Sequence, residues 1–150
     1  MKILFTAFEG MHNTSFQLAD QTGADYVLLT NSFPGRKRDI SSVSCEYDSV
    51  YMFGVDKRLT DRIRIEMCAV NHDETVRTQA DISCLEEKLK AREISYVVSD
   101  QPADYLCNAS YYHMLSKNPK AVFIHIPSLS GMTAEMMKKP VAVFKDIYFV

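Results

Sequence analysis

The sequence predicts an α/β protein in which a mostly parallel central sheet lies between two layers of helices. Short runs of β-branched and aromatic residues alternate with longer helix-like stretches along the chain. Two of the later runs, 95–98 and 121–124, are almost continuously apolar, as expected for strands that helices cover on both faces. Strands of such a sheet bring their carboxyl ends to one edge, where ligands gather, so the functional site is expected there.

Six strands are expected, because each of six short runs is rich in residues that favour extended backbone and is followed by a turn or a helix-like stretch. In chain order they are 2–7, 26–29, 49–53, 63–65, 95–98 and 121–124. The pattern predicts strand and helix alternating throughout. The tail, 140–150, fits either a strand or a helix.

Three helices are expected between these strands. The first spans about 15–21, because Asn13, Thr14 and Ser15 are capping residues and Gly23 is a helix terminator. The second spans 81–92, where apolar residues recur on one stripe with charges opposite. The third spans 105–116, after a capping Asp104 and before an Asn-Pro pair.

Bulk composition favours one domain, 1–150, because 150 residues that are 47% apolar suffice for a single core. The net charge is −2, and the basic residues are scattered except at 36–38 and 138–139, so nucleic acid is not an expected partner. No apolar run approaches the roughly 18 residues of a membrane span, and none has the layout of a signal peptide. The expectation is a cytoplasmic protein without a membrane partner.

The four cysteines are far apart and show no CxxC spacing, so neither a disulfide framework nor a metal site is implied, and no cofactor is expected. Cys107 nevertheless comes soon after one strand, Glu66 directly after another, and His125 at the end of a third, so all three side chains are expected at one sheet edge. A neighbouring imidazole and a helix amino terminus both lower a thiol pKa, which predicts a reactive thiolate. Glu66 would orient the His125 ring. From these residues alone, a buried structural cysteine, a hydrogen-bonded histidine and a solvated glutamate remain alternatives.

Four segments resemble the pyroglutamyl peptidase I (pyrrolidone-carboxylate peptidase) family. The segment 99–108, Ser-Asp-Gln-Pro-Ala-Asp-Tyr-Leu-Cys-Asn, with a following Tyr-Tyr pair, is similar to its nucleophile segment. The segment 122–127, Val-Phe-Ile-His-Ile-Pro, is similar to its histidine strand. The segment 65–71 resembles its Glu-x-x-Ala-x-Asn motif, and 2–15 its opening strand and helix start. The segments occur in the family's order.

The resemblance implies a three-layer α/β/α fold of the phosphorylase/hydrolase-like type and a thiol exopeptidase. Cys107 would attack the carbonyl that links an N-terminal pyroglutamate to the next residue, and an acyl-enzyme would form on sulfur. His125 would act as general base and then acid, and Glu66 would orient it. Backbone amides at the start of the Cys107 helix would receive the oxyanion. The implied partner is a small peptide with a blocked N-terminus, and a homo-oligomer stays open.

The substrate pocket implied by the resemblance is built from five further residues. Phe8 and Tyr105 would pack against the lactam ring, and backbone around Asn13 and Gly54 would hydrogen-bond its amide. Met11 stands where the family has a second aromatic residue, in a loop that here reads Phe-Glu-Gly-Met-His and lacks the family's double glycine. The chain is also shorter than family members in several places. A thiol amidase for another small acyl group and a non-catalytic binding descendant are therefore alternatives.

Overall fold

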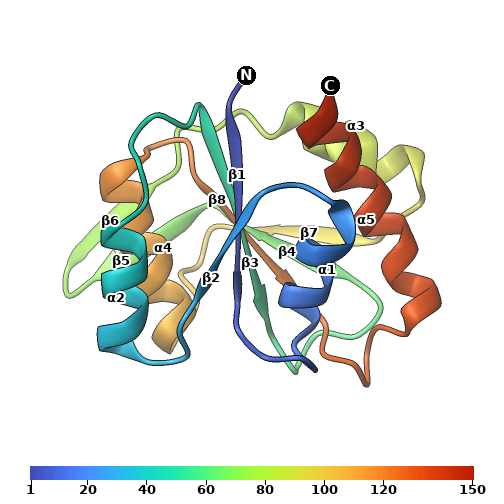
Figure 1. The fold of residues 1–150 in the computed structure, drawn as a ribbon, viewed down its shortest axis with the longest axis horizontal. Coiled ribbons are helices and arrows are strands. Elements are labelled where there is room, and N and C mark those ends of the chain that lie inside the picture. Colours follow the sequence, from blue (N-terminus) through green and yellow to red (C-terminus); the bar gives the residue numbers. More distant parts are fainter.

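A six-stranded sheet forms the centre of the computed structural model, which describes residues 1–150 (Figure 1). The strand order is β2-β1-β3-β8-β4-β7. The six strands are β1 (Ile3–Phe8), β2 (Tyr26–Leu29), β3 (Ser49–Val55), β4 (Ile63–Glu66), β7 (Tyr96–Ser99) and β8 (Val122–Ile126). A separate hairpin is formed by β5 (Cys68–Asn71) and β6 (Glu74–Arg77).

Five helices cover the two faces of this sheet (Figure 1). They are α1 (Thr14–Thr22), α2 (Phe33–Ser41), α3 (Ser83–Ala91), α4 (Tyr105–Lys117) and α5 (Ala134–Phe149). One buried apolar cluster joins α1, α3 and α5 to one face, and a second joins α2, α4 and the hairpin to the other. The predicted three-layer α/β/α architecture is confirmed.

The three predicted helices are present, with the expected local causes. The Asn13 side chain caps α1 by accepting hydrogen bonds from the Ser15 and Phe16 amides, and Gly23 ends it at φ +75°. On α3, Leu85 and Leu89 form the buried stripe. The structure adds α2 and the β5–β6 hairpin, which the sequence pattern did not indicate.

The expectation of strand and helix alternating throughout is wrong in the middle of the chain. No helix separates β3 from β4, and β4 runs antiparallel to β8, its neighbour on one side. Strands β1, β2, β3 and β8 are mutually parallel, and β7 is parallel to β4. The sheet is therefore mostly parallel, as predicted, but the carboxyl end of β4 lies at the opposite edge from that of β8.

The apolar run 95–98 is also not covered on both faces. It forms β7, an edge strand in which Val97 and Val98 are exposed. By contrast, every residue of β8 is buried, as predicted for the run 121–124. The undecided tail belongs to α5, with Pro140 inside the helix and buried. None of the helices combines the length and the apolar character that crossing a membrane requires.

Candidate active site

Glu66 and His125 meet across two antiparallel strands. His125 on β8 is opposite Arg64 on β4, and Glu66 is opposite Phe123, so Glu66 reaches the histidine ring diagonally. The His125 Nδ1 lies 2.9 Å from the Glu66 Oε1, and both side chains are almost fully buried. Since a carboxylate only accepts hydrogen bonds, the ring donates from Nδ1 and leaves Nε2 free. The predicted pair is present, but it arises from diagonal pairing and not from a shared carboxyl edge.

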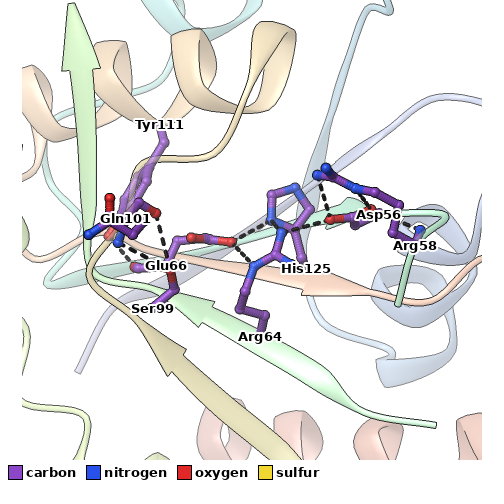
Figure 2. Close-up of polar contacts among 8 residues, drawn as sticks. All are labelled: Asp56, Arg58, Arg64, Glu66, Ser99, Gln101, Tyr111 and His125. Atoms are coloured by element: carbon purple, nitrogen blue, oxygen red, sulfur yellow. Dashed lines mark hydrogen bonds and ion pairs between the residues drawn. The ribbon is translucent and has the colours of Figure 1, made fainter. Parts of the chain in front are cut away.

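Arg64 continues this pair into a chain of alternating charges (Figure 2). Its Nε donates to the same Glu66 oxygen that receives the His125 ring, and its Nη2 donates to Asp56 at 2.8 Å. Arg58 also donates to Asp56, from Nε to Oδ1 and from Nη2 to Oδ2, the oxygen that accepts from Arg64. The second carboxylate oxygen of Glu66, Oε2, is buried and has no hydrogen-bond partner. One Glu66 oxygen therefore serves both the imidazole and the guanidinium.

Contacts among these charged side chains shift the pKa values of Asp56 and Arg64. Burial acts to raise the pKa of Asp56, but hydrogen bonds from Arg58 and Arg64 outweigh it and hold that pKa well below its ordinary range. Burial acts to lower the pKa of Arg64, but hydrogen bonds to Glu66 and Asp56 raise it overall. Asp56 and Arg64 are therefore fully ionised at neutral pH.

Cys107 lies in the first turn of α4, and its sulfur packs against Gly54 of β3. A methyl group added at Gly54 would come within 3.1 Å of Cys107 Sγ. Gly54 is in turn the parallel-strand neighbour of His125. The absence of a side chain at Gly54 thus allows the thiol to approach the strand next to the histidine.

The expectation of a lowered Cys107 pKa is wrong for the free protein. Burial raises the pKa of Cys107 to about 12, and the negative charges of Asp56 and Glu66 act in the same direction. The positive charge of Arg64 opposes them only partly. Cys107 Sγ also makes no hydrogen bond with the His125 ring. The resting site therefore holds a neutral Cys107 thiol.

The start of α4 offers backbone donors next to this thiol. The first hydrogen bond of the helix runs from the Asn108 amide to the Asp104 carbonyl, at 3.4 Å. The preceding amides of Tyr105, Leu106 and Cys107 donate to no protein acceptor. Asp104 occupies the N-cap position, as predicted, but its side chain makes no capping hydrogen bond. These free amides are the donors that an oxyanion would require.

Two polar side chains hold α4 in place. Asn108 donates to the Val70 carbonyl at 2.8 Å and accepts from the Val70 amide at 2.9 Å, which ties the helix to β5. The Tyr111 hydroxyl donates to the Glu66 carbonyl at 2.8 Å (Figure 2). The helix that carries Cys107 is thereby fixed to the end of the strand that carries Glu66.

Cys107 and His125 border one cavity of about 390 Å³, which we call the thiol cavity. Asp56, Arg58, Arg64 and the segment 103–107 also line it, so Tyr105 is at its rim. Of the other residues expected to bind substrate, Gly54 contacts Cys107, and Phe8 is buried in the apolar cluster against which Cys107 packs.

Met11 and Asn13 are not brought to the thiol cavity. Met11 is 82% exposed in the loop between β1 and α1. The amide of Asn13 already donates to the Gly10 carbonyl, and the Asn13 side chain caps α1. Their substrate contacts stay predictions.

Asp56, Arg58 and Arg64 are the site residues that the sequence analysis missed. A signal for Arg64 existed, because Ile-Arg-Ile-Glu alternates apolar and polar residues and so places Arg64 on the same strand face as Glu66. No such alternation of apolar and polar residues includes Asp56 and Arg58, so the sequence pattern gave no signal for them. No three His, Cys, Asp or Glu side chains form a group that could hold a metal ion.

The fold and this site can be compared with known proteins. No family model and no curated protein sequence matches the chain. Among solved structures, pyroglutamyl peptidase I from Bacillus amyloliquefaciens matches with a TM-score of 0.82 and 17% identity over 99% of this chain and 95% of that one. A mutant pyrrolidone carboxyl peptidase from Pyrococcus furiosus matches with a TM-score of 0.77 and 21% identity over 99% and 98%.

The enzyme from Thermus thermophilus is similar as well. It matches with a TM-score of 0.75 and 18% identity over 96% of this chain and 95% of that one. The likeness extends over nearly the whole of each chain, although the sequences have diverged widely. The chain has the fold of the pyrrolidone carboxyl peptidases, as the sequence resemblance implied.

Proposed function

We propose that the protein is a cysteine exopeptidase that hydrolyses the amide bond after an N-terminal pyroglutamate. The observation that carries the proposal is the convergence of Cys107 and His125 on one cavity, with Glu66 hydrogen-bonded to the far nitrogen of the histidine ring. This is the arrangement that nucleophilic catalysis requires: a nucleophile and a base at one cavity, and a third group that orients the base. The substrate is a small peptide with a blocked N-terminus.

Acylation begins from the neutral thiol. As Cys107 Sγ attacks the pyroglutamyl carbonyl, the thiol proton passes to Nε2 of His125, so that the imidazolium forms only during attack. Glu66 stabilises that imidazolium through Nδ1. The oxyanion is received by the free amides at the start of α4. The C–N bond then breaks, His125 returns the proton to the leaving amine, and the pyroglutamyl group remains on sulfur as a thioester.

Deacylation uses the same groups. A water molecule gives a proton to His125 Nε2 as it attacks the thioester carbonyl. The C–S bond breaks, free pyroglutamate leaves, and the proton returns to the sulfur. A site that keeps the thiol neutral until substrate arrives suits this general-base route, because no buried thiolate has to be maintained between turnovers.

A related thiol amidase with a different small acyl substrate is the second candidate. Two observations favour it: Met11 is 82% exposed, and the Asn13 amide is already hydrogen-bonded within its own loop. The resemblance places both residues beside the lactam. If that loop does not contact substrate, selectivity for the lactam has to come from elsewhere around the thiol cavity.

Turnover of a chromogenic pyroglutamyl amide tests the proposal. The wild-type protein should release the chromophore, and Cys107→Ser should reduce the rate by at least about a thousandfold, since the alcohol is the poorer nucleophile in a site built for a thiol. Cys84→Ser, which changes an exposed cysteine on α3, is the matched control and should retain full activity. His125→Ala should lower kcat about 10²- to 10⁴-fold, the usual contribution of a general base.

Two results would decide against the proposal. Release of chromophore from an acetyl or a formyl amide but not from the pyroglutamyl amide supports the second candidate. No turnover of any blocked amide, with Cys107→Ser folded like the wild type, indicates a binding protein that has kept the fold without the reaction.

A further inference from the structure

A second, larger cavity adjoins the thiol cavity. Its volume is about 560 Å³, and we call it the basic groove. One wall is a stripe along α4 that consists of Tyr105, Asn108, Ala109, Tyr112, His113 and Ser116. The other walls are Phe33, Arg36 and Lys37 of α2, and the segment 70–72 at the end of β5. Figure 1 shows α2, α4 and the hairpin gathered on one side of the sheet.

Positive charge in this groove is not neutralised by the protein. Arg36 and Lys37 line it, and neither is among the residues that form ion pairs. No aspartate or glutamate lines the groove, although the chain contains 19 of them. His72 and His113 also line the groove. An unpaired cationic concavity of this kind attracts anionic ligands.

Two polar atoms in the groove residues are buried without a hydrogen-bond partner, namely Nε of Arg36 and Nδ1 of His113. Buried polar atoms are normally satisfied, so both side chains retain hydrogen-bonding capacity that the protein does not use. Burial lowers the pKa of His113, and the charges of Arg36, Lys117 and Lys37 lower it further. The positive potential of Arg36, Lys37 and Lys117 therefore extends to the wall that contains His113.

Tyr105 connects the groove to the chemistry. It lines both cavities, is 84% exposed, and lies two residues before Cys107. From Tyr105 to Ser116 the stripe rises through eleven residue-to-residue steps of the helix, about 16 Å at 1.5 Å per step. An extended peptide advances about 3.3 Å per residue, so the groove accommodates about five residues.

We propose that the basic groove binds acidic side chains of the peptide that follows the scissile amide. This inference rests on the proposed function, because the thiol cavity supplies the point at which that peptide begins. Arg36 reaches the α4 backbone at Ala109, where its Nη1 lies 3.4 Å from the carbonyl, about 6 Å along the helix from Tyr105. At about 3.3 Å per residue, this distance corresponds to about two residues of an extended peptide. The acidic residues recognised are therefore the second and third after the scissile bond.

Hydrolysis of two matched peptides tests the inference. One is pyroglutamyl-Ala-Glu-Glu-Ala and the other replaces both glutamates by glutamine. The wild-type protein should cleave the acidic peptide with a kcat/KM about five- to tenfold higher at low salt, since each partly exposed charge pair contributes up to about fivefold. At 0.5 M NaCl the preference should largely disappear, because screening shortens the range of the attraction.

Variants assign the preference to the groove. Arg36→Gln and Lys37→Gln together should reduce the preference, measured as the ratio of the two kcat/KM values, to less than about twofold. Lys139→Gln, which removes a basic residue lining a different cavity beside α5, is the matched control and should keep the preference. Equal cleavage of both peptides by the wild type would overturn the inference and leave the proposed function intact.

A binding measurement keeps the inference testable if no pyroglutamyl peptide is cleaved. Fluorescence anisotropy of labelled acetyl-Ala-Glu-Glu-Ala should show binding to the wild-type protein that weakens in the Arg36→Gln, Lys37→Gln double variant. Such binding without turnover would refute the proposed function and retain an acidic-peptide groove. Binding of inorganic phosphate in the absence of peptide binding would overturn the inference in favour of a phosphate site.

Discussion

The pH dependence of Cys107 alkylation is the most direct test of the electrostatics of this site. The pKa of Cys107 is raised from an ordinary 9.0 to about 12, chiefly by burial. Thiolate is the reactive species, so near neutral pH it should be about a thousandfold rarer at Cys107 than at a thiol of ordinary pKa. The rate of alkylation should therefore rise about tenfold for each pH unit between pH 7.5 and 10.5, without a plateau.

The assay is iodoacetamide labelling followed residue by residue with mass spectrometry, which separates Cys107 from the exposed Cys45 and Cys84. A cysteine in an unstructured peptide is the reference, and its rate should level off above about pH 9.5. Burial also slows access of the reagent, but this lowers the rate by the same factor at every pH and leaves the slope unchanged. Circular dichroism at each pH verifies that the protein stays folded.

A plateau of the Cys107 rate below about pH 9 would refute this reasoning. It would mean that the free protein stabilises a thiolate, as a thiolate–imidazolium pair would do. The variant His125→Ala sharpens the result. Because the ring is not hydrogen-bonded to the sulfur, its removal should leave the pH dependence of the Cys107 alkylation rate unchanged. If the wild type were alkylated rapidly at low pH and the variant were not, the result would show the ion pair that the structure lacks.

Three further predictions concern the scaffold of the site. Gly54→Ala places a methyl group 2.6 Å from Cζ of Phe123, so urea unfolding should show a loss of about 1 to 3 kcal/mol; an unchanged midpoint would contradict the close packing. Asn108→Ala removes both hydrogen bonds to Val70, which should cost about 2 kcal/mol and speed amide exchange in the β5–β6 hairpin first. Asp56→Asn should cost about 2 kcal/mol at pH 7, because a carboxylate with a depressed pKa stabilises the fold above its ordinary pKa of 3.8. That difference should shrink as the pH falls below about 4, and an equal difference at pH 7 and pH 3 would argue against the ionic role.

Local patterns in the sequence were sufficient for α1, α3 and β8. Asn13 and Gly23 bound α1 because a side-chain cap and a left-handed terminator act within a few residues. The stripe on α3 and the buried run of β8 follow from helical period and from continuous apolarity. Elements whose character depends on distant residues were missed or misjudged. Pro140, normally a helix breaker, obscured α5, which packs against α1 and α3.

In the candidate site, too, some features follow from the local sequence and others from contacts between distant residues. Motifs in the sequence singled out Glu66, Cys107 and His125, which supply a carboxylate, a thiol and an imidazole that the fold does bring together in one region. How these groups meet, and in which protonation state the thiol rests, depends on tertiary contacts. The direction of β4 is set by its pairing with β8, so Glu66 reaches His125 diagonally and draws in Arg64 and Asp56.

The protonation state of Cys107 depends on burial and on charged residues far away in the sequence, and no local motif records these. Cys107 at a helix start suggests a stabilised thiolate, but in the folded protein the loss of water around the sulfur, with Asp56 and Glu66 nearby, favours the neutral thiol. Local motifs therefore indicated the fold class and the candidate reacting groups, whereas three-dimensional packing sets the electrostatics around those groups.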